Sequence, residues 1–447
     1  MLEPRFPQEI PAIRAAAQRA LAAREKLVAA APAWETWRRQ AKAIKCQVIT
    51  RLDAYGAQLR KEVEGWGGQV WEAADGQEAN RLILSLARRF NCRQVVKAKS
   101  MTGEEIGLNA ALTGAGITVV ETDLGEFIIQ LAGDTPAHLT APAMHLHRRD
   151  IATLFQERLG LAGETEPAAL SRQGAAHLRQ HFWQADMGMT GVNFAAAASG
   201  HLVMLENEGN LRLTASAPPV HVAVMGLEKM IPQLADLEVF LRLLPTSATG
   251  QRLTAYVNFI AGLKPQPQGR QAFYLILLDN GRRQLAADPD FREALFCLRC
   301  GACLNICPVF QVGGGHLYNH VYPGAIGIVL AAFLGGKAVD LTDLCTQCGA
   351  CAQVCPVAID LPRLIVRLRE RSQHHPWLRR AVKLSSLLFQ HPYLYRRLAP
   401  LGRRLLPHLP ATAAKAWWGQ YRAVPVIPPK SFVEMITATA TPPPEKD

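Results

Sequence analysis

The stretch CLRCGACLNICP at residues 297–308 and its repeat CTQCGACAQVCP at residues 345–356 decide how the C-terminal half of the chain folds. Both follow the spacing C-x2-C-x2-C-x3-C-P, and together they hold eight of the ten cysteines in 447 residues. A cubane 4Fe–4S cluster needs four thiolates arranged as a tetrahedron. Three cysteines at this close spacing can surround one face of such a cluster, and the fourth ligand then comes from elsewhere in the chain. The repeat therefore predicts a domain built around two 4Fe–4S clusters.

The last cysteine of each run is predicted to bind the cluster of the other run, as in two-cluster ferredoxins. The predicted ligand sets are Cys297, Cys300, Cys303 and Cys355 for cluster 1, and Cys345, Cys348, Cys351 and Cys307 for cluster 2. Two zinc sites are the alternative, but zinc ribbons combine C-x2-C units and have no use for the third cysteine of each run. Cys46 and Cys92 are expected to be small, buried apolar side chains.

Composition and charge indicate the cellular compartment and limit the class of protein. We find no signal-peptide pattern and no apolar run long enough to cross a bilayer, so we expect a cytoplasmic protein. In a reducing compartment, closely spaced cysteines indicate metal ligands before disulfides. The net charge is +12, but the segment from Arg363 to Lys430 alone contains 14 Lys or Arg and one acid. The basic excess therefore belongs to one segment, which argues against a nucleic-acid-binding protein.

The chain is predicted to have four regions: a helical segment at 1–62, an α/β domain at 63–285, a dicluster domain at 286–371, and a basic helical tail with a disordered end at 372–447. Within the α/β domain, strands are predicted at 94–100, 117–123, 201–207, 221–226 and 272–280, and a strand or extended segment at 137–143. Helices are predicted at 103–116, 125–133 and 148–160, and one helix between the cysteine runs at 321–334. This alternation indicates a mainly parallel sheet covered by helices.

Polar groups gather where predicted strands end, in KAKSMTGEE (97–105), ETDLGE (121–126), MTGVNFA (189–195) and LENEGN (205–210). Ligands of open α/β sheets bind at this edge, where helix N-termini favour an anion. The candidate anion- or substrate-binding residues are Lys97, Lys99, Ser100, Thr102, Glu121, Asp123, Glu126, Thr190, Asn193, Glu206, Glu208 and Asn210. No catalytic triad can be assembled, so the catalytic residues stay unassigned.

Several of these residues have a simpler structural interpretation. Thr102 with Glu105 fits a capping box, Asp123 with Glu126 fits a second one, and turn chemistry explains the Asn and Gly of LENEGN. His316 and His320 lie between the cysteine runs. They fit ligands or proton relays, but ordinary loop histidines are the simpler interpretation.

No G-x-G-x-x-G follows a strand and no C-x-x-C-H is present, so the nucleotide and haem-attachment fingerprints are absent. The chain can pass electrons, but it shows no motif that would take a hydride from an organic substrate. We therefore expect an oxidoreductase component that acts as an electron carrier and needs partner subunits.

The stretches KSMTGEEIGLN, ETDLGEFIIQL, TGVNFA, LENEGN and HVAVMGLEK, followed by the two cysteine runs, resemble in this order the lactate utilization protein B family. The resemblance implies a LUD domain, with a fold similar to the NagB/RpiA/CoA-transferase group, followed by an α-helical dicluster ferredoxin module. It also implies an electron-transfer subunit of a cytoplasmic system that oxidises L-lactate to pyruvate. The implied partners are a cysteine-rich protein resembling heterodisulfide-reductase subunits and a smaller LUD-domain protein.

Two alternatives remain open at this point. One is an iron–sulfur subunit of another 2-hydroxy-acid or glycerol-phosphate dehydrogenase. The other is a redox-sensing, anion-binding enzyme of the sugar-phosphate or CoA-transferase-like fold. The basic tail interleaves Leu, Tyr and Phe with pairs of Arg, which is compatible with docking on an acidic partner, with contact to an anionic membrane surface, or with packing on its own domain.

Overall fold

The structure is a computed structural model, and it describes residues 9–262, 265–266, 269–270, 272–334, 341–371, 376–405, 428–430 and 435–436. The chain divides into two compact units. One contains residues 2–372, and the other contains residues 373–447 together with Met1. The larger unit holds the sheet and both cysteine runs.

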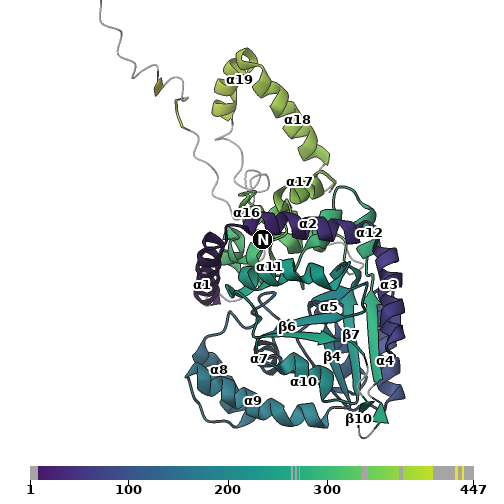
Figure 1. Cartoon of the computed structure of the whole chain (residues 1–447). Helices are drawn as coiled ribbons and strands as arrows, with labels where there is room; N and C mark the ends of the chain where they lie inside the picture. Colours follow the sequence, from purple (N-terminus) through teal and green to yellow (C-terminus); the bar gives the residue numbers. More distant parts are fainter. Residues whose placement is uncertain are drawn as a thin grey trace, which may run out of the picture. The chain divides into compact units, whose positions relative to one another are not determined.

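Three helices open the larger unit, in agreement with the Ala-rich, charge-speckled sequence: α1 (Ile10–Ala29), α2 (Trp34–Ile49) and α3 (Leu52–Gly65). α3 contacts the first strand of the main sheet. α1 and α2 contact α11 (Leu237–Thr249) and also helices of the cysteine module. The N-terminal helices therefore join the α/β part of the unit to its cysteine module (Figure 1).

The main sheet has six strands in the order β1-β12-β7-β4-β2-β3, and every neighbouring pair is parallel. The strands are β1 (Gln69–Ala73), β2 (Gln94–Lys97), β3 (Thr118–Glu121), β4 (Met187–Gly191), β7 (Val220–Gly226) and β12 (Ala272–Leu278). All seven residues of β7 are buried, as expected for a parallel strand that is covered on both faces. The predicted mainly parallel sheet is confirmed.

Successive residues of a strand point to opposite faces of the sheet, and both faces of this sheet carry apolar side chains. Helices therefore cover both faces. Tyr274 and Ile276 of β12 share a core with α4, whereas Phe273 and Leu275 share a core with α3. The covering helices of the α/β part are α4 (Gly76–Arg89), α5 (Met101–Glu105), α6 (Leu108–Gly114), α7 (Leu124–Ala132), α8 (Arg148–Leu159), α9 (Pro167–Gln184), α10 (Asn210–Ser216) and α12 (Arg282–Ala287). The helix predicted at 103–116 is broken in two because Gly107 adopts a left-handed φ of 63°.

A second sheet of four strands has the order β8-β5-β6-β9 and mixes parallel and antiparallel pairs. Its strands are β5 (Phe194–Ala196), β6 (Leu202–Glu206), β8 (Met230–Ile231) and β9 (Tyr256–Ile260), and a separate short hairpin pairs β10 (Pro265–Gln266) with β11 (Gly269–Arg270). The strand predicted at 201–207 therefore forms but lies outside the parallel sheet. Residues 137–143 form an irregular loop.

The cysteine module is built from short helical segments, as predicted. They are η4 (Arg292–Phe296), α13 (Ala302–Asn305), α14 (Pro308–Gly313), η5 (His316–Tyr318), α15 (Gly324–Leu330), η6 (Thr342–Leu344), α16 (Ala350–Val354) and α17 (Leu361–Arg371). α15 lies in the predicted 321–334 helix, and it contacts both α13 and α17. It forms the apolar centre between the two cysteine runs.

In the smaller unit the structure describes two helices, α18 (Pro376–Gln390) and α19 (Pro392–Leu405). They contact each other, and Leu384, Phe389 and Tyr393 are exposed. Within the described part of the chain, no helix combines the length and apolar character that crossing a membrane requires.

Candidate functional site

The eight cysteines of the two runs line two small cavities. One cavity is lined by Cys297, Cys300, Cys303 and Cys355, and the other by Cys345, Cys348, Cys351 and Cys307. Each set takes three cysteines from one run and the last cysteine from the other. We call these the first and the second cysteine cavity. Four thiols around one small cavity are the donor set that a 4Fe–4S cluster requires.

The backbone around the two cavities repeats the same turn. Arg299 and Gln347 occupy equivalent positions and adopt left-handed φ angles of 61° and 58°. Their backbone N–H groups donate to Cys297 Sγ at 3.3 Å and to Cys345 Sγ at 3.4 Å. A left-handed conformation costs a non-glycine residue roughly 1–3 kcal/mol and persists where the surroundings impose it. Both runs therefore curl so that backbone donors face sulfur.

Burial determines the protonation state of these thiols when no metal is bound. It raises the pKa of Cys300 and Cys351 to about 12 and that of Cys355 to about 11. Such thiols stay protonated at neutral pH unless a cation binds, whereas a metal deprotonates its thiol ligands outright. Of the two remaining cysteines, Cys92 is buried as predicted, but the prediction for Cys46 is wrong because its side chain is exposed.

Basic side chains of the N-terminal helices hold the loop that contains Cys355. Arg38 Nε donates to the Cys355 carbonyl at 2.8 Å, and Arg24 Nη2 donates to the Val354 carbonyl at 2.9 Å. Lys42 Nζ donates to the Ala358 carbonyl at 2.9 Å. Sequence reasoning missed these residues because their partners lie more than 300 positions further along the chain.

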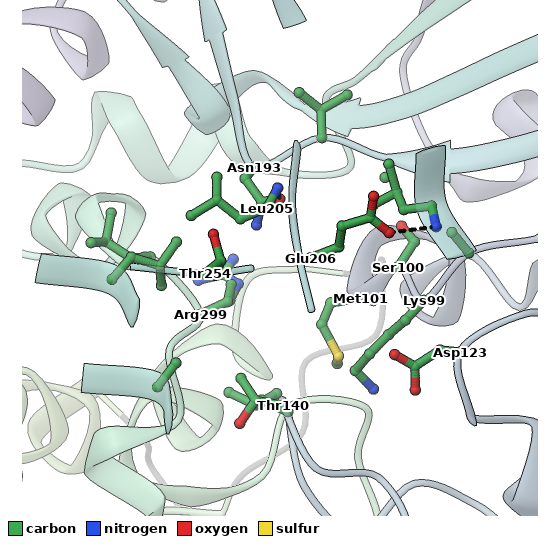
Figure 2. A pocket seen from close by; sticks show the side chains of 18 of the residues that line it. Lys99, Ser100, Met101, Asp123, Thr140, Asn193, Leu205, Glu206, Thr254 and Arg299 are labelled. Atoms are coloured by element: carbon green, nitrogen blue, oxygen red, sulfur yellow. Dashed lines mark hydrogen bonds between the residues drawn. The ribbon is translucent and has the colours of Figure 1, made fainter. Parts of the chain in front are cut away.

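A larger cavity of about 280 Å³ lies where β2, β4 and β7 end, and it extends to the cysteine module. Lys99, Met101, Thr140, Glu206 and Arg299 surround it in Figure 2. We call it the sheet-edge cavity. Of the predicted binding residues, it is lined by Lys99, Ser100, Thr102, Asp123, Asn193, Glu206, Glu208 and Asn210. The sequence therefore located this edge of the sheet correctly.

Four predicted binding residues lie outside the lining. Lys97 is buried and forms ion pairs with Glu121 at 2.7 Å and with Glu104 at 3.1 Å. Thr190 shares a hydrogen bond of 2.9 Å with His221 Nε2. Glu126 pairs with Lys99. These side chains are occupied by internal partners.

Some of the residues that line the sheet-edge cavity cap helices, but the capping residues are not all those that the sequence predicted. Ser100, not Thr102, caps α5 by accepting a hydrogen bond from Gly103 N at 3.1 Å, so the capping box predicted for Thr102 and Glu105 is wrong. Asp123 caps α7 as predicted. The Glu126 carboxylate, however, binds Lys99 and not the backbone of Asp123.

The LENEGN segment and Asn193 are also tied to the backbone. Glu206 accepts from Leu211 N at 2.7 Å, and Glu208 accepts from Leu124 N at 3.0 Å. Asn193 Oδ1 accepts from Leu205 N at 2.8 Å. Glu206 and Glu208 therefore stabilise the starts of α10 and α7, and Asn193 binds the backbone of β6.

A buried charge network next to the sheet-edge cavity was not predicted, and two of its members, Glu228 and Arg299, line the cavity. Both terminal nitrogens of Arg282 bind Glu105 at 2.8 Å, and its Nε binds Glu228. Arg299 Nη2 reaches Glu228 Oε1 at 3.3 Å. Burial opposes ionisation of Glu228, yet Arg282 and Arg299 hold its pKa well below the usual range. The network links the sheet edge to Arg299, which lies between Cys297 and Cys300.

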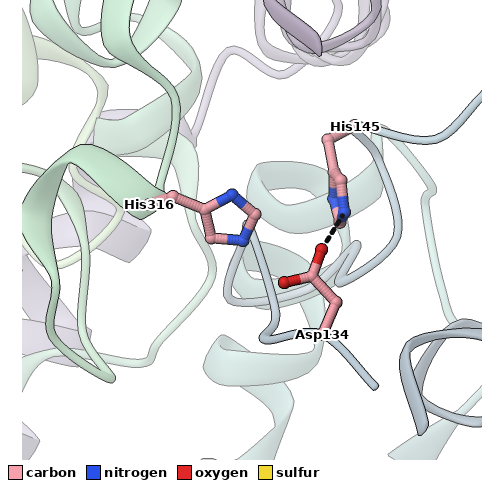
Figure 3. Close-up of side chains that lie close together, drawn as sticks. All are labelled: Asp134, His145 and His316. Carbon is pink, nitrogen blue, oxygen red and sulfur yellow. Dashed lines mark hydrogen bonds and ion pairs between the residues drawn. The ribbon is translucent and has the colours of Figure 1, made fainter. Parts of the chain in front are cut away.

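His316 lies beside Asp134 and His145 (Figure 3). Asp134 Oδ2 and His145 Nε2 are 3.2 Å apart, and His316 Nε2 donates to the Thr135 carbonyl at 2.9 Å. His316 therefore connects the loop after α7 to the cysteine module. His320 Nδ1 accepts from Tyr322 N at 3.1 Å, which is the local bond expected of a loop histidine.

A parallel α/β domain joined to two four-cysteine cavities defines the chain as a two-part iron–sulfur protein. The LUD domain family model matches residues 56–277, and the 4Fe-4S dicluster domain model matches residues 293–359. The chain belongs to the family of proteins that combine these two domains and include lactate utilization protein B.

Two relatives illustrate the similarity. The uncharacterized electron transport protein YkgF of Escherichia coli is 42% identical over 394 residues, which cover 86% of this chain and 82% of YkgF. Lactate utilization protein B of Bacillus cytotoxicus is 42% identical over 304 residues, which cover 68% of this chain but only 64% of that protein. A crystal structure of a DUF162 family protein from Deinococcus radiodurans aligns with 51% of this chain and 98% of its own, at 12% identity and a TM-score of 0.29.

Proposed function

We propose that this chain carries two 4Fe–4S clusters and transfers electrons in a cytoplasmic system that oxidises L-lactate to pyruvate. Cluster 1 would be held by Cys297, Cys300, Cys303 and Cys355, and cluster 2 by Cys345, Cys348, Cys351 and Cys307. The observation that carries the proposal is the exchange of Cys355 and Cys307 between the two cysteine cavities. This exchange is the ligand pattern of two-cluster ferredoxins.

Each bound cluster would supply a site for one electron, and oxidation of lactate to pyruvate releases two electrons and two protons. The residues of this chain hold the thiols in place, donate backbone N–H groups to sulfur and set the local charge. Arg24 and Arg38 lie beside the first cysteine cavity. Positive charge stabilises a reduced cluster, so these two arginines should raise the potential of cluster 1, as Arg369, which donates to the Cys345 carbonyl at 2.7 Å, should raise that of cluster 2.

The descriptions of two relatives support electron transfer and lactate utilization, respectively. YkgF is described as an electron transport protein, and the Bacillus cytotoxicus relative as a lactate utilization protein. The description of YkgF names no substrate, so an iron–sulfur subunit of another 2-hydroxy-acid or glycerol-phosphate dehydrogenase is the second candidate. Reduction by glycolate in place of L-lactate would favour it.

We also propose two partner chains: a cysteine-rich protein resembling heterodisulfide-reductase subunits and a smaller LUD-domain protein. α18 and α19 expose apolar side chains between arginines, among them Leu387, Phe389 and Leu398. A partner with an acidic, partly apolar surface fits this segment, and an anionic membrane surface is the alternative.

The test is anaerobic purification followed by iron and sulfide analysis and EPR spectroscopy. We expect about eight iron atoms per chain. We also expect cluster signals to appear on adding L-lactate only when both partner proteins are present. A preparation that contains zinc in place of iron, or clusters that lactate and the partners never reduce, would contradict the proposal.

A further inference from the structure

Two cations of the sheet-edge cavity lie on the wall that faces the cysteine module. Arg299 is in the loop between Cys297 and Cys300, and Lys229 ends the short η2 helix (Leu227–Lys229) that follows β7. Both line the cavity together with Tyr322 of the cysteine module. The cavity therefore extends from the α/β domain to the loop that would hold cluster 1.

Some N–H groups of these two cations have no hydrogen-bond acceptor. Arg299 is 7% exposed, its guanidinium lies over the Tyr322 ring at 4.7 Å, and its Nη2 binds Glu228. Arg299 Nη1 is buried without a hydrogen-bond partner among the residues that the structure describes. Lys229 is half-buried and makes no hydrogen bond or ion pair to any described residue. Burial lowers its pKa to about 8, although Glu228 opposes the shift.

Unsatisfied donors at a cavity wall indicate a missing acceptor. A buried polar group without a hydrogen-bond partner destabilises the fold, and a buried charged group without one does so more strongly. Other buried cations nearby have their partners: Lys97 pairs with two carboxylates, and Arg282 does so as well. Arg299 and Lys229 therefore differ from Lys97 and Arg282, each of which is neutralised by two carboxylates.

The remaining charges limit the kind of acceptor. Asp123, Glu206 and Glu208 line the cavity as well, and these acids oppose a ligand with a high negative charge. A monoanion that places its charge on the Arg299 side avoids this repulsion. The hydroxyls of Thr140 and Thr254 donate to His138 Nδ1 and to the Tyr256 carbonyl, so each can still accept a hydrogen bond from an uncharged polar part of the same ligand.

We propose that the sheet-edge cavity binds a small hydroxy- or oxo-monocarboxylate, with its carboxylate on Lys229 and Arg299, beside cluster 1. The choice of cluster 1 as the neighbour rests on the proposed function, whereas carboxylate binding itself does not. The α/β domain is then a ligand-binding domain that senses or receives the acid on which the electron-transfer system acts.

Binding should be coupled to the redox state of cluster 1. A carboxylate beside the cluster disfavours the additional negative charge of the reduced state, so the ligand binds the oxidised state more tightly. By reciprocity, the ligand lowers the cluster 1 potential by the same free energy. A tenfold preference for the oxidised state corresponds to a shift of about 59 mV for one electron.

Calorimetric titration of the oxidised, anaerobically purified protein with pyruvate, L-lactate and inorganic phosphate tests the proposal. We expect pyruvate or L-lactate to bind and phosphate to bind at least tenfold more weakly. Lys229→Met should weaken carboxylate binding at least tenfold. Arg299→Lys should weaken it less, because lysine keeps the positive charge but lacks the two parallel N–H donors of the guanidinium. Lys61→Met, an exposed control on α3, should change nothing.

Iron content and EPR spectra of the dithionite-reduced variants separate loss of ligand contact from loss of the cluster. Unchanged iron with weakened binding supports the proposal. It is overturned if neither acid binds, if Lys229→Met binds the acid as the parent does, or if phosphate binds equally well. Failure of the proposed function looks different: carboxylate binding would persist while lactate and the partners fail to reduce the clusters.

Discussion

Replacing Arg38 by Gln should lower the reduction potential of cluster 1. Arg38 donates through Nε to the Cys355 carbonyl at 2.8 Å and through Nη2 to the Ala352 carbonyl at 3.2 Å, so its charge is fixed beside the first cysteine cavity. A unit charge at about 8 Å and an effective dielectric constant of about 20 is worth about 2 kcal/mol. For a one-electron couple this energy corresponds to about 90 mV.

Two features reduce that figure. Glu35 pairs with Arg38 at 2.8 Å and offsets part of its charge, and the Arg38 side chain is 12% exposed, so solvent screens the rest. We therefore expect a decrease of about 30–90 mV in cluster 1 and a much smaller change in cluster 2. Glu35→Gln removes the offsetting charge and should raise the cluster 1 potential.

EPR-monitored redox titration of the anaerobic protein measures both potentials. Arg39→Gln is the matched control, because Arg39 is one position away on the same helix and exposed. Iron content has to match that of the parent protein, since Arg38 also positions the loop that contains Cys355. Arg38→Gln with full iron content and unchanged potentials would refute the argument that N-terminal cations tune cluster 1.

Three further predictions address the fold, its pH dependence and the tail. Lys97→Met should lower the free energy of unfolding by about 3–5 kcal/mol in urea titrations, because Glu121 is left buried without a counter-charge. A change as small as that of exposed Lys61→Met would contradict this. Burial lowers the pKa of His221 to about 3, so the unfolded state binds a proton below pH 6.5 that the folded state excludes, and stability falls as the pH drops. In thermal unfolding monitored by circular dichroism between pH 7 and pH 5, His221→Gln should flatten this fall, and an unchanged slope would count against it. Deletion of residues 372–447 should weaken partner binding more at low than at high salt, and a salt-independent loss would argue against electrostatic docking.

The cysteine sets could be predicted from the sequence because cluster chemistry imposes the spacing of their ligands. The sheet edge could also be located, since polar residues follow apolar strands at Lys97–Ser100 and at Glu206. Which of these side chains face the cavity could not be predicted. Lys97 and Lys99 are two positions apart, yet Lys97 is buried in an ion-paired cluster and Lys99 lines the cavity.

Contacts between distant segments lay beyond the sequence pattern. Nothing in the Ala-rich N-terminal helices indicates that Arg24 and Arg38 bind carbonyls beside Cys355. The Glu105–Arg282–Glu228–Arg299 network joins residues from four separate segments. The apolar sequence of β6 fits a strand of a parallel sheet and a strand of a mixed sheet equally well. Its place in the second sheet is decided by its pairing with β5 and β9.

The exchange of the last cysteine between the two runs is tested most directly by iron analysis and EPR spectroscopy of two double variants. Cys297→Ser with Cys355→Ser removes two ligands of cluster 1 and none of cluster 2, so we predict about four iron atoms per chain and one intact cluster signal. Cys297→Ser with Cys307→Ser removes one ligand from each cluster and should perturb both signals. The opposite outcome, with one intact cluster in the second variant and two damaged clusters in the first, would contradict the account.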